Sequence, residues 1–260
     1  MIRRHLYTEV RITPLANIAK RVAVFSLPVI VLAVLLHRYG VLEYEVAYIT
    51  LVAGFGIALL GMAVALAALV VIWNEGLRGL GGALLALVIG VAVLAWPLYE
   101  FARGVNLPWI VDVTTDTADP PRFIAVASAR PSGANPVVYP GEPTAVLQLR
   151  AYPGVRPYDL EAGPDEVFNA ALALVENRGW RVLDSVSPRG GERDGRIEAV
   201  TQTLVMGFRE DVSIRIRTLS SDRVRIDMRS ASRYGSYDFG SNARRVESFL
   251  TDFIEARRRR

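Results

Sequence analysis

Two long apolar runs without a charged side chain constrain this chain more than any other feature. Residues 46–73 and 80–99 contain no Asp, Glu, Lys, Arg or His. A helix needs about 20 such residues to cross the hydrocarbon core of a bilayer. Both runs therefore predict transmembrane helices, and one soluble globule does not fit the whole chain.

A third apolar run, residues 22–36, is shorter and is flanked by Lys20, Arg21 and Arg38. Long basic side chains can extend toward the headgroups, so a run of this length can still span. The alternative is a cleaved signal peptide, which needs small residues after the apolar run. Residues 37–40 are a poor match to that requirement, and we interpret the run as a first transmembrane helix.

The basic residues near the first run predict the orientation. Cytoplasmic flanks of membrane helices carry an excess of Lys and Arg. Residues 1–21 are therefore predicted to be cytoplasmic, and three crossings by residues 22–101 place the rest outside, in the periplasm if the membrane is a bacterial inner membrane. This placement depends on the first run crossing the bilayer. The basic residues before that run are Arg3, Arg4, Arg11, Lys20 and Arg21.

The predicted spans contain small residues four positions apart but no ionisable groups. The absence of intramembrane charges argues against a pump or a proton-coupled transporter. Small residues let helices approach closely, either within this anchor or between copies. The small residues in question are Gly54 and Ala58, Gly61 and Ala65, and Gly82, Ala86 and Gly90.

The composition changes after the third run. Residues 102–143 are rich in Pro, which excludes long helices and central strands, and we expect an extended lead-in. Residues 144–260 are expected to form an α+β domain with a basic tail at residues 257–260. This tail either is solvated or contacts anionic headgroups. Residues 145–149 are interpreted as a short strand.

Periodicity gives the elements of this domain. Apolar residues at helical spacing predict a helix after Pro164, and Gly179 is typical of its C-terminal end. Period-two alternation predicts half-buried antiparallel strands. The predicted fold is a three-span membrane α-helical anchor plus an α+β domain with helices on one sheet face. The remaining expected elements are strands at 180–186, 196–201, 212–217 and 223–229, turns at 189–195 and 219–222, and a final helix from about 242.

The alternation places many arginines on the second sheet face. Arginine forks bind carboxylate, phosphate or sulfate in a bidentate way, so this face is a candidate site for an anionic lipid or glycan. The alternative is a set of cross-strand ion pairs, each contributing about 0.2–1 kcal/mol. The charged residues of this face are Arg196, Arg215, Arg217, Arg223, Arg225 and Arg229, with Glu198 and Asp227 among them.

A second candidate site is the glycine-containing segment between the last strand and the last helix. Its polar residues either converge on one ligand or fasten a long loop. Serine catalysis there lacks a base, because residues 104–260 contain neither His nor Lys. Carboxylate chemistry by Glu198, Asp211 or Asp238 stays open. The candidate ligand-binding residues are Arg215, Arg217, Arg229, Ser230, Ser232, Arg233, Asp238, Asn242 and Arg245.

In this order along the chain, residues 112–123, 196–199, 208–217 and 229–245 resemble the bacterial and plastid family known as domain of unknown function 1499. The resemblance covers roughly residues 105–254 and implies a membrane-anchored form of that domain. It implies no catalytic roles. The residues that carry the family pattern, besides the candidates above, are Asp112, Thr114, Thr115, Asp116, Glu198, Asp211, Gly235 and Gly240.

These observations favour a non-enzymatic membrane protein whose outer domain binds an anionic lipid, a glycan or a partner protein. One alternative is a carboxylate-dependent envelope hydrolase or transferase. Another is a structural subunit of a membrane complex. No metal and no cofactor are expected, since Cys is absent and the two His lie at His5 and His37. Nucleic acid is not an expected partner, because the domain without its tail is net acidic.

Overall fold

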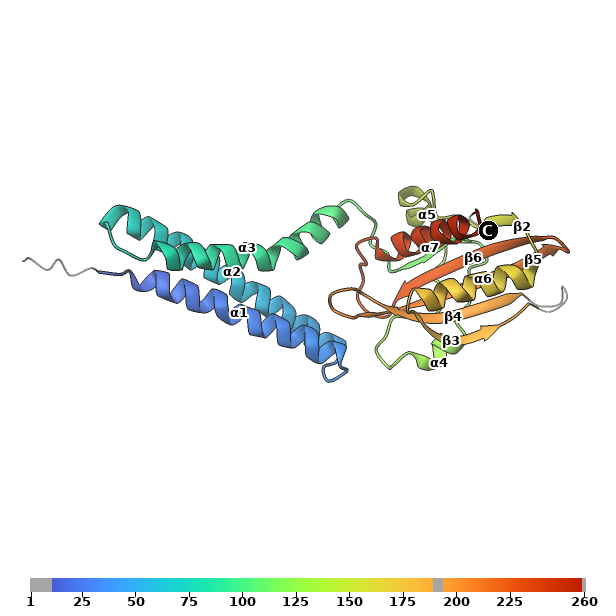
Figure 1. Cartoon of the computed structure of the whole chain (residues 1–260), viewed down its shortest axis with the longest axis horizontal. Helices are drawn as coiled ribbons and strands as arrows, with labels where there is room; N and C mark the ends of the chain where they lie inside the picture. Colours follow the sequence, from blue (N-terminus) through green and yellow to red (C-terminus); the bar gives the residue numbers. More distant parts are fainter. Residues whose placement is uncertain (1–10, 189–193, 259–260) are drawn as a thin grey trace, which may run out of the picture. The chain divides into compact units, whose positions relative to one another are not determined.

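The computed structural model describes residues 11–188 and 194–258. The chain divides into two compact units, residues 1–102 and 103–260, which are drawn together in Figure 1. Most of the turn predicted at residues 189–195 lies outside the described residues.

The first unit consists of long apolar helices. In the described part of the chain, three helices are long and apolar enough to cross a membrane, as predicted. The run at 22–36 is the middle of a longer helix that begins at Pro14, so the first candidate span is a helix of 25 residues, with Lys20 and Arg21 inside it. The three helices are α1 (Pro14–Arg38), α2 (Tyr44–Glu75) and α3 (Leu80–Gly104).

Small residues bring these helices together. A Cβ added to Gly61 would lie 3.0 Å from the backbone nitrogen of Ala23, and one added to Gly82 would lie 3.1 Å from the carbonyl oxygen of Ala16. Ala65 and Ala68 are fully buried in the same cluster. The small-residue spacing therefore serves packing among the three helices themselves.

The second unit is an α+β domain with an antiparallel sheet, as predicted. The sheet order is β1-β6-β5-β4-β3, and β2 pairs with the other half of β6, so that two short strands share one edge. Of these two, only β1 belongs to the Pro-rich residues 102–143, which form no central strand because Pro cannot donate to a ladder. The strands are β1 (Asp112–Thr114), β2 (Tyr158–Glu161), β3 (Arg181–Val186), β4 (Gly195–Gln202), β5 (Arg209–Ser220) and β6 (Arg223–Ser232).

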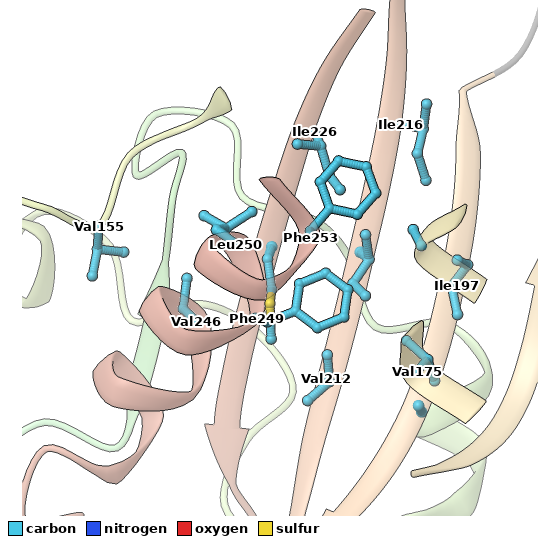
Figure 2. Close-up of a cluster of buried hydrophobic side chains, with 14 of the residues drawn as sticks. Val155, Val175, Ile197, Val212, Ile216, Ile226, Val246, Phe249, Leu250 and Phe253 are labelled. Atoms are coloured by element: carbon cyan, nitrogen blue, oxygen red, sulfur yellow. The ribbon is translucent and has the colours of Figure 1, made fainter. Parts of the chain in front are cut away.

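Two helices cover one sheet face, α6 (Pro164–Asn177) and α7 (Ser241–Arg258). Phe249 and Phe253 of α7 stack on each other and lie against the apolar side chains of β5 and β6 (Figure 2). Each contributes about 1.5–3 kcal/mol through burial. The main core therefore fills this face and leaves the charged residues of the strands on the other.

The interpretation of residues 145–149 as a strand is wrong. They belong to helix α5 (Glu142–Ala151), which has Pro in its first turn and Glu142 near its positive end. A five-residue helix, α4 (Ala125–Ala129), precedes it. Phe123 and Val126, beside and within α4, form a small second cluster with Ala231 of β6.

Candidate functional site

The arginines of the second sheet face are paired with carboxylates. Arg215 of β5 lies directly opposite Asp227 of β6, and their nitrogen and oxygen atoms are 2.8 Å apart. Asp116 and Asp119, from the segment before α4, also contact Arg215. The other pairs on this face are Arg196 with Asp184 and Glu198, Arg217 with Asp119, Arg223 and Arg225 with Asp159, and Arg229 with Asp112.

The Arg229–Asp112 pair is buried and bidentate. Nε and Nη2 of Arg229 donate to the two carboxylate oxygens of Asp112 over 2.9 and 2.6 Å. The guanidinium also donates to the carbonyls of Pro121 and Val137 and lies 4.4 Å from the centre of the Phe123 ring. Burial raises the pKa of Asp112, and Arg229 opposes that rise. The hydrogen bonds of this fork are directed to groups of the protein itself.

Asp211 holds a second buried cluster. Its carboxylate accepts hydrogen bonds from Nε of Arg130 at 2.8 Å and from Nη2 of Arg233 at 2.7 Å. The side chains of Asp211 and Arg233 are 0% and 1% exposed. Arg130 comes from the end of α4, so this cluster fastens the segment before α5 to the sheet.

Polar residues at the end of β6, at the start of α7 and at the start of β5 bond to one another. Ser230 donates to Asn242, Asn242 donates to Ser232, and Ser232 donates to Glu210. Arg245 donates to Ser230 and Asn242 and pairs with Glu210. Burial, then nearby Arg178, lowers the pKa of Arg245 to about 10. These hydrogen bonds fasten the start of α7 to the end of β6.

Asp238 begins α7. It accepts the backbone N–H groups of Gly240 at 2.8 Å and Asn242 at 2.9 Å, as a residue at a helix start does. Burial raises the pKa of its carboxyl, and these hydrogen bonds oppose the rise. Gly240 has φ +73° and a Cβ there would lie 2.7 Å from Leu107.

The residues that carry the family resemblance join the lead-in to the sheet. Glu198 accepts backbone N–H groups of Ile124 and Val126, and so holds the start of α4. The hydroxyl of Thr115 accepts the N–H of Met228 at 2.9 Å. The Thr114 hydroxyl bonds within its own turn, Asp116 contacts both that turn and Arg215, and Gly235 adopts φ +81°.

A different set of arginines lines a cavity of about 370 Å³ at one end of the sheet. Ligand pockets for small molecules begin at about 300 Å³. None of the described residues that line it is acidic. We call it the arginine pocket. The residues that give it its chemistry are Arg178, Trp180, Arg181, Thr201, Gln202 and Arg209.

Two arginines of the arginine pocket have no carboxylate opposite them in the ladder, whereas those of the second sheet face are paired with carboxylates. Across the ladder, Arg209 faces Gln202 and Arg181 faces Val200, neither of which is an anion. Within the described ranges, the side chains of Arg181 and Arg209 form no ion pair or hydrogen bond. Arg178 differs, because it pairs with Asp252 at 2.6 Å and lies 5.3 Å from the Trp180 ring.

The sequence interpretation did not select these residues. Arg181 and Arg209 begin β3 and β5, outside the alternating stretches that directed attention to the sheet face. What distinguishes Arg181 and Arg209 is that neither has an acid opposite it in the neighbouring strand. This can be seen only once the strand register is known. The predicted site residues Arg215, Arg217 and Arg229 instead lie among carboxylates.

A second cavity, of about 540 Å³, lies between residues 154–158 and α7. Its described lining residues include one cation, Arg156, one anion, Glu247, and the apolar side chains of Leu250 and Ile254. It therefore lacks the uniform charge that would select an ion.

The fold defines a class of protein in which an α+β domain follows, along the chain, three helices that are long and apolar enough to cross a membrane. The model of the family described as protein of unknown function (DUF1499) matches residues 112–253, and the chain belongs to that family. The arginine pocket lies inside the matched region. No curated protein matches the chain.

Proposed function

We propose that this protein is a membrane-anchored binding module of the bacterial inner membrane, whose periplasmic α+β domain binds an anionic ligand in the arginine pocket. The observation that carries the proposal is the pair Arg181 and Arg209, which line a cavity with no acidic residue among its described walls. Guanidinium groups bind phosphate and carboxylate through charge-assisted hydrogen bonds. A carboxylate-dependent hydrolase would need acids where these walls carry cations.

The binding test uses the purified full chain in a neutral detergent, with calorimetric titration of two soluble anions. Glycerol 3-phosphate represents a phosphate ligand and an oligogalacturonate represents an acidic glycan. Replacing Arg181→Gln and Arg209→Gln together removes two charge-assisted hydrogen bonds, and we expect affinity to fall more than about tenfold.

The matched control for this test is Arg217→Gln. It also removes one guanidinium, which is partly exposed, but Arg217 pairs with Asp119 at 2.6 Å on the other face. The control should leave affinity within about twofold, because that arginine is already neutralised. Equal losses in both variants, or no binding of either anion by the parent, would contradict the proposal.

The periplasmic placement rests on the basic residues before α1 and on an odd number of crossings. Alkaline phosphatase is active only outside the cytoplasm, so a fusion after Arg260 should be active in living cells. A green fluorescent protein fusion at the same place should be dark after export. The opposite pair of results would place the domain in the cytoplasm and leave the binding proposal to its own test.

A further inference from the structure

The chain enters the α+β domain at one definable end. The hydroxyl of Tyr237 donates to the carbonyl of Gly104, the last residue of α3. A Cβ on Gly104 would lie 2.5 Å from the ring of Phe239, so only glycine fits there without rearrangement. Five residues later, the Trp109 ring stacks on Tyr237 with centroids 5.1 Å apart.

The same end of the sheet carries the arginine pocket. Residue 112 begins β1 opposite Ala231, so the residues before it lie beyond the carboxyl end of β6. Glu210, at the start of β5, pairs with Ser232 at that end of β6, and Thr201 of β4 pairs with Glu210. The neighbouring residue Arg209 therefore lies at the end where the chain enters.

Apolar side chains are exposed at this end. Trp109 is 73% exposed, and Leu204, in the turn between β4 and β5, is 83% exposed. That turn is well defined, since Thr203 and Phe208 bond through backbone and side chain at 2.9 and 3.0 Å. An exposed Trp and exposed cations at the same end of a domain are typical of surfaces at the headgroup level of a bilayer.

Chain length limits how far Trp109 can lie from the membrane. Five residues extend at most about 17 Å, and the headgroup layer is about 7 Å thick on each side. Because α3 is long and apolar enough to span, Trp109 stays within reach of the interface.

We propose that this end of the domain contacts the bilayer that α3 crosses, and that the arginine pocket takes the phosphodiester headgroup of an anionic phospholipid. The inference rests on the proposed function, since it names the source of the anion. It requires nothing about which side of the membrane the domain occupies. A free phosphate or an acidic glycan is the alternative source that the test distinguishes.

The chain contains no cysteine, so single-cysteine variants can be spin-labelled without removing native thiols. Leu204→Cys places a label beside the arginine pocket. Ser221→Cys, exposed in the β5–β6 turn at the opposite end of the sheet, is the matched control. The full chain is reconstituted in phosphatidylcholine vesicles with and without phosphatidylglycerol, and label accessibility to oxygen and to a water-soluble nickel chelate is compared.

We expect the label at Leu204→Cys to be more accessible to oxygen than to the nickel chelate, and more so with phosphatidylglycerol. The label at Ser221→Cys should favour the nickel chelate in both vesicles. Adding Arg181→Gln and Arg209→Gln should abolish the effect of phosphatidylglycerol, while adding Arg217→Gln should not. Aqueous accessibility at Leu204→Cys in both vesicles overturns the inference.

The outcomes separate this inference from the proposed function. Binding of glycerol 3-phosphate in detergent, together with an aqueous label, keeps the arginine pocket as an anion site and removes the lipid as its ligand. A label that lies in the lipid, but whose accessibility is the same with and without phosphatidylglycerol, overturns the proposal of a headgroup site. A label that responds to phosphatidylglycerol and depends on Arg181 and Arg209 supports both.

Discussion

Arginines occur in two different surroundings in this domain. Those on the second sheet face, which we call the paired face, lie beside carboxylates, whereas two of those in the arginine pocket do not. On the face, the six arginines each have a carboxylate partner, and Arg229 is 2% exposed. In the pocket, Arg181 and Arg209 are exposed and lie opposite Val200 and Gln202. The comparison teaches that a dense group of arginines can be internal scaffolding, and it is the arginines without a carboxylate partner that we propose as the ligand site.

The difference arises from acids that other segments of the chain bring to the face. The segment between β1 and α5 supplies Asp116 and Asp119, β2 supplies Asp159, and the Asp112–Arg229 pair joins residues 117 apart in sequence. No such segment lies among the described walls of the pocket. Four predictions test whether the first set of arginines holds the fold and the second does not.

The largest effect is expected for Asp211→Asn. Removing this charge leaves Arg130 and Arg233 buried without their carboxylate, at 4% and 1% side-chain exposure. Breaking a buried pair by removing one partner costs about 3–5 kcal/mol. Urea unfolding of the full chain in detergent, followed by tryptophan fluorescence, measures the loss. A loss below about 1 kcal/mol would mean that the cluster behaves like a surface pair.

A somewhat smaller loss, about 3 kcal/mol, is expected for Asp112→Asn. Arg229 retains the carbonyls of Pro121 and Val137 and its contact with the Phe123 ring. The double variant Asp112→Leu with Arg229→Met removes both charges and should recover much of the loss in the same unfolding assay. A double variant that is less stable than Asp112→Asn would show that the loss of stability comes from losing the ion pair itself and not from leaving Arg229 without a partner.

A third prediction concerns pH. The hydrogen bond from Arg225 holds the pKa of Asp159 below its usual value of 3.8, whereas burial raises that of Asp227. Stability from Asp159 is therefore present above pH 3.8 and lost as pH falls through its lower folded-state pKa. Asp227 has the opposite sign, and stability falls as pH rises from 3.8 through its raised pKa.

The measurement is a carbon-13 NMR titration of the labelled carboxyl groups. Arg225→Gln should raise the pKa of Asp159 toward 3.8 and leave that of Asp227 above it. The accompanying stability change should stay below about 1 kcal/mol, because the Asp159 pairs are partly exposed. An unchanged pKa of Asp159 would contradict the assignment of its shift to Arg225.

The elements of this fold could be predicted because they depend on local pattern. Charge-free runs gave the three apolar helices, and period-two alternation gave β4, β5 and β6 and their arginine face. The prediction of a strand at residues 145–149 was wrong for a local reason. A run of five residues is compatible with either a strand or a helix, and the Pro143 just before it is typical of the first turn of a helix.

The partners of the arginines could not be predicted. Alternation states which face a side chain occupies, but not which distant segment lies over that face. Asp116 and Asp119 reach Arg215 across 99 and 96 residues, and Glu198 holds Ile124 across 74. The arginine pocket was missed for the same reason, since its identity depends on the register of Arg209 opposite Gln202.

The smallest expected effect on stability is at the pocket, and it completes the comparison. Arg181→Gln and Arg209→Gln remove exposed cations that have no acid opposite them in the ladder, so each should change the free energy of unfolding by less than about 0.5 kcal/mol. Urea unfolding in detergent measures this beside Asp211→Asn. Glycerol 3-phosphate should stabilise the parent against urea, because a ligand of the folded state alone shifts the unfolding equilibrium. It should stabilise the double variant much less, while Arg217→Gln responds like the parent. If removing Arg181 and Arg209 instead destabilised the domain as strongly as removing Asp211, these two arginines would be scaffold like the paired face, and the distinction between the two regions would be lost.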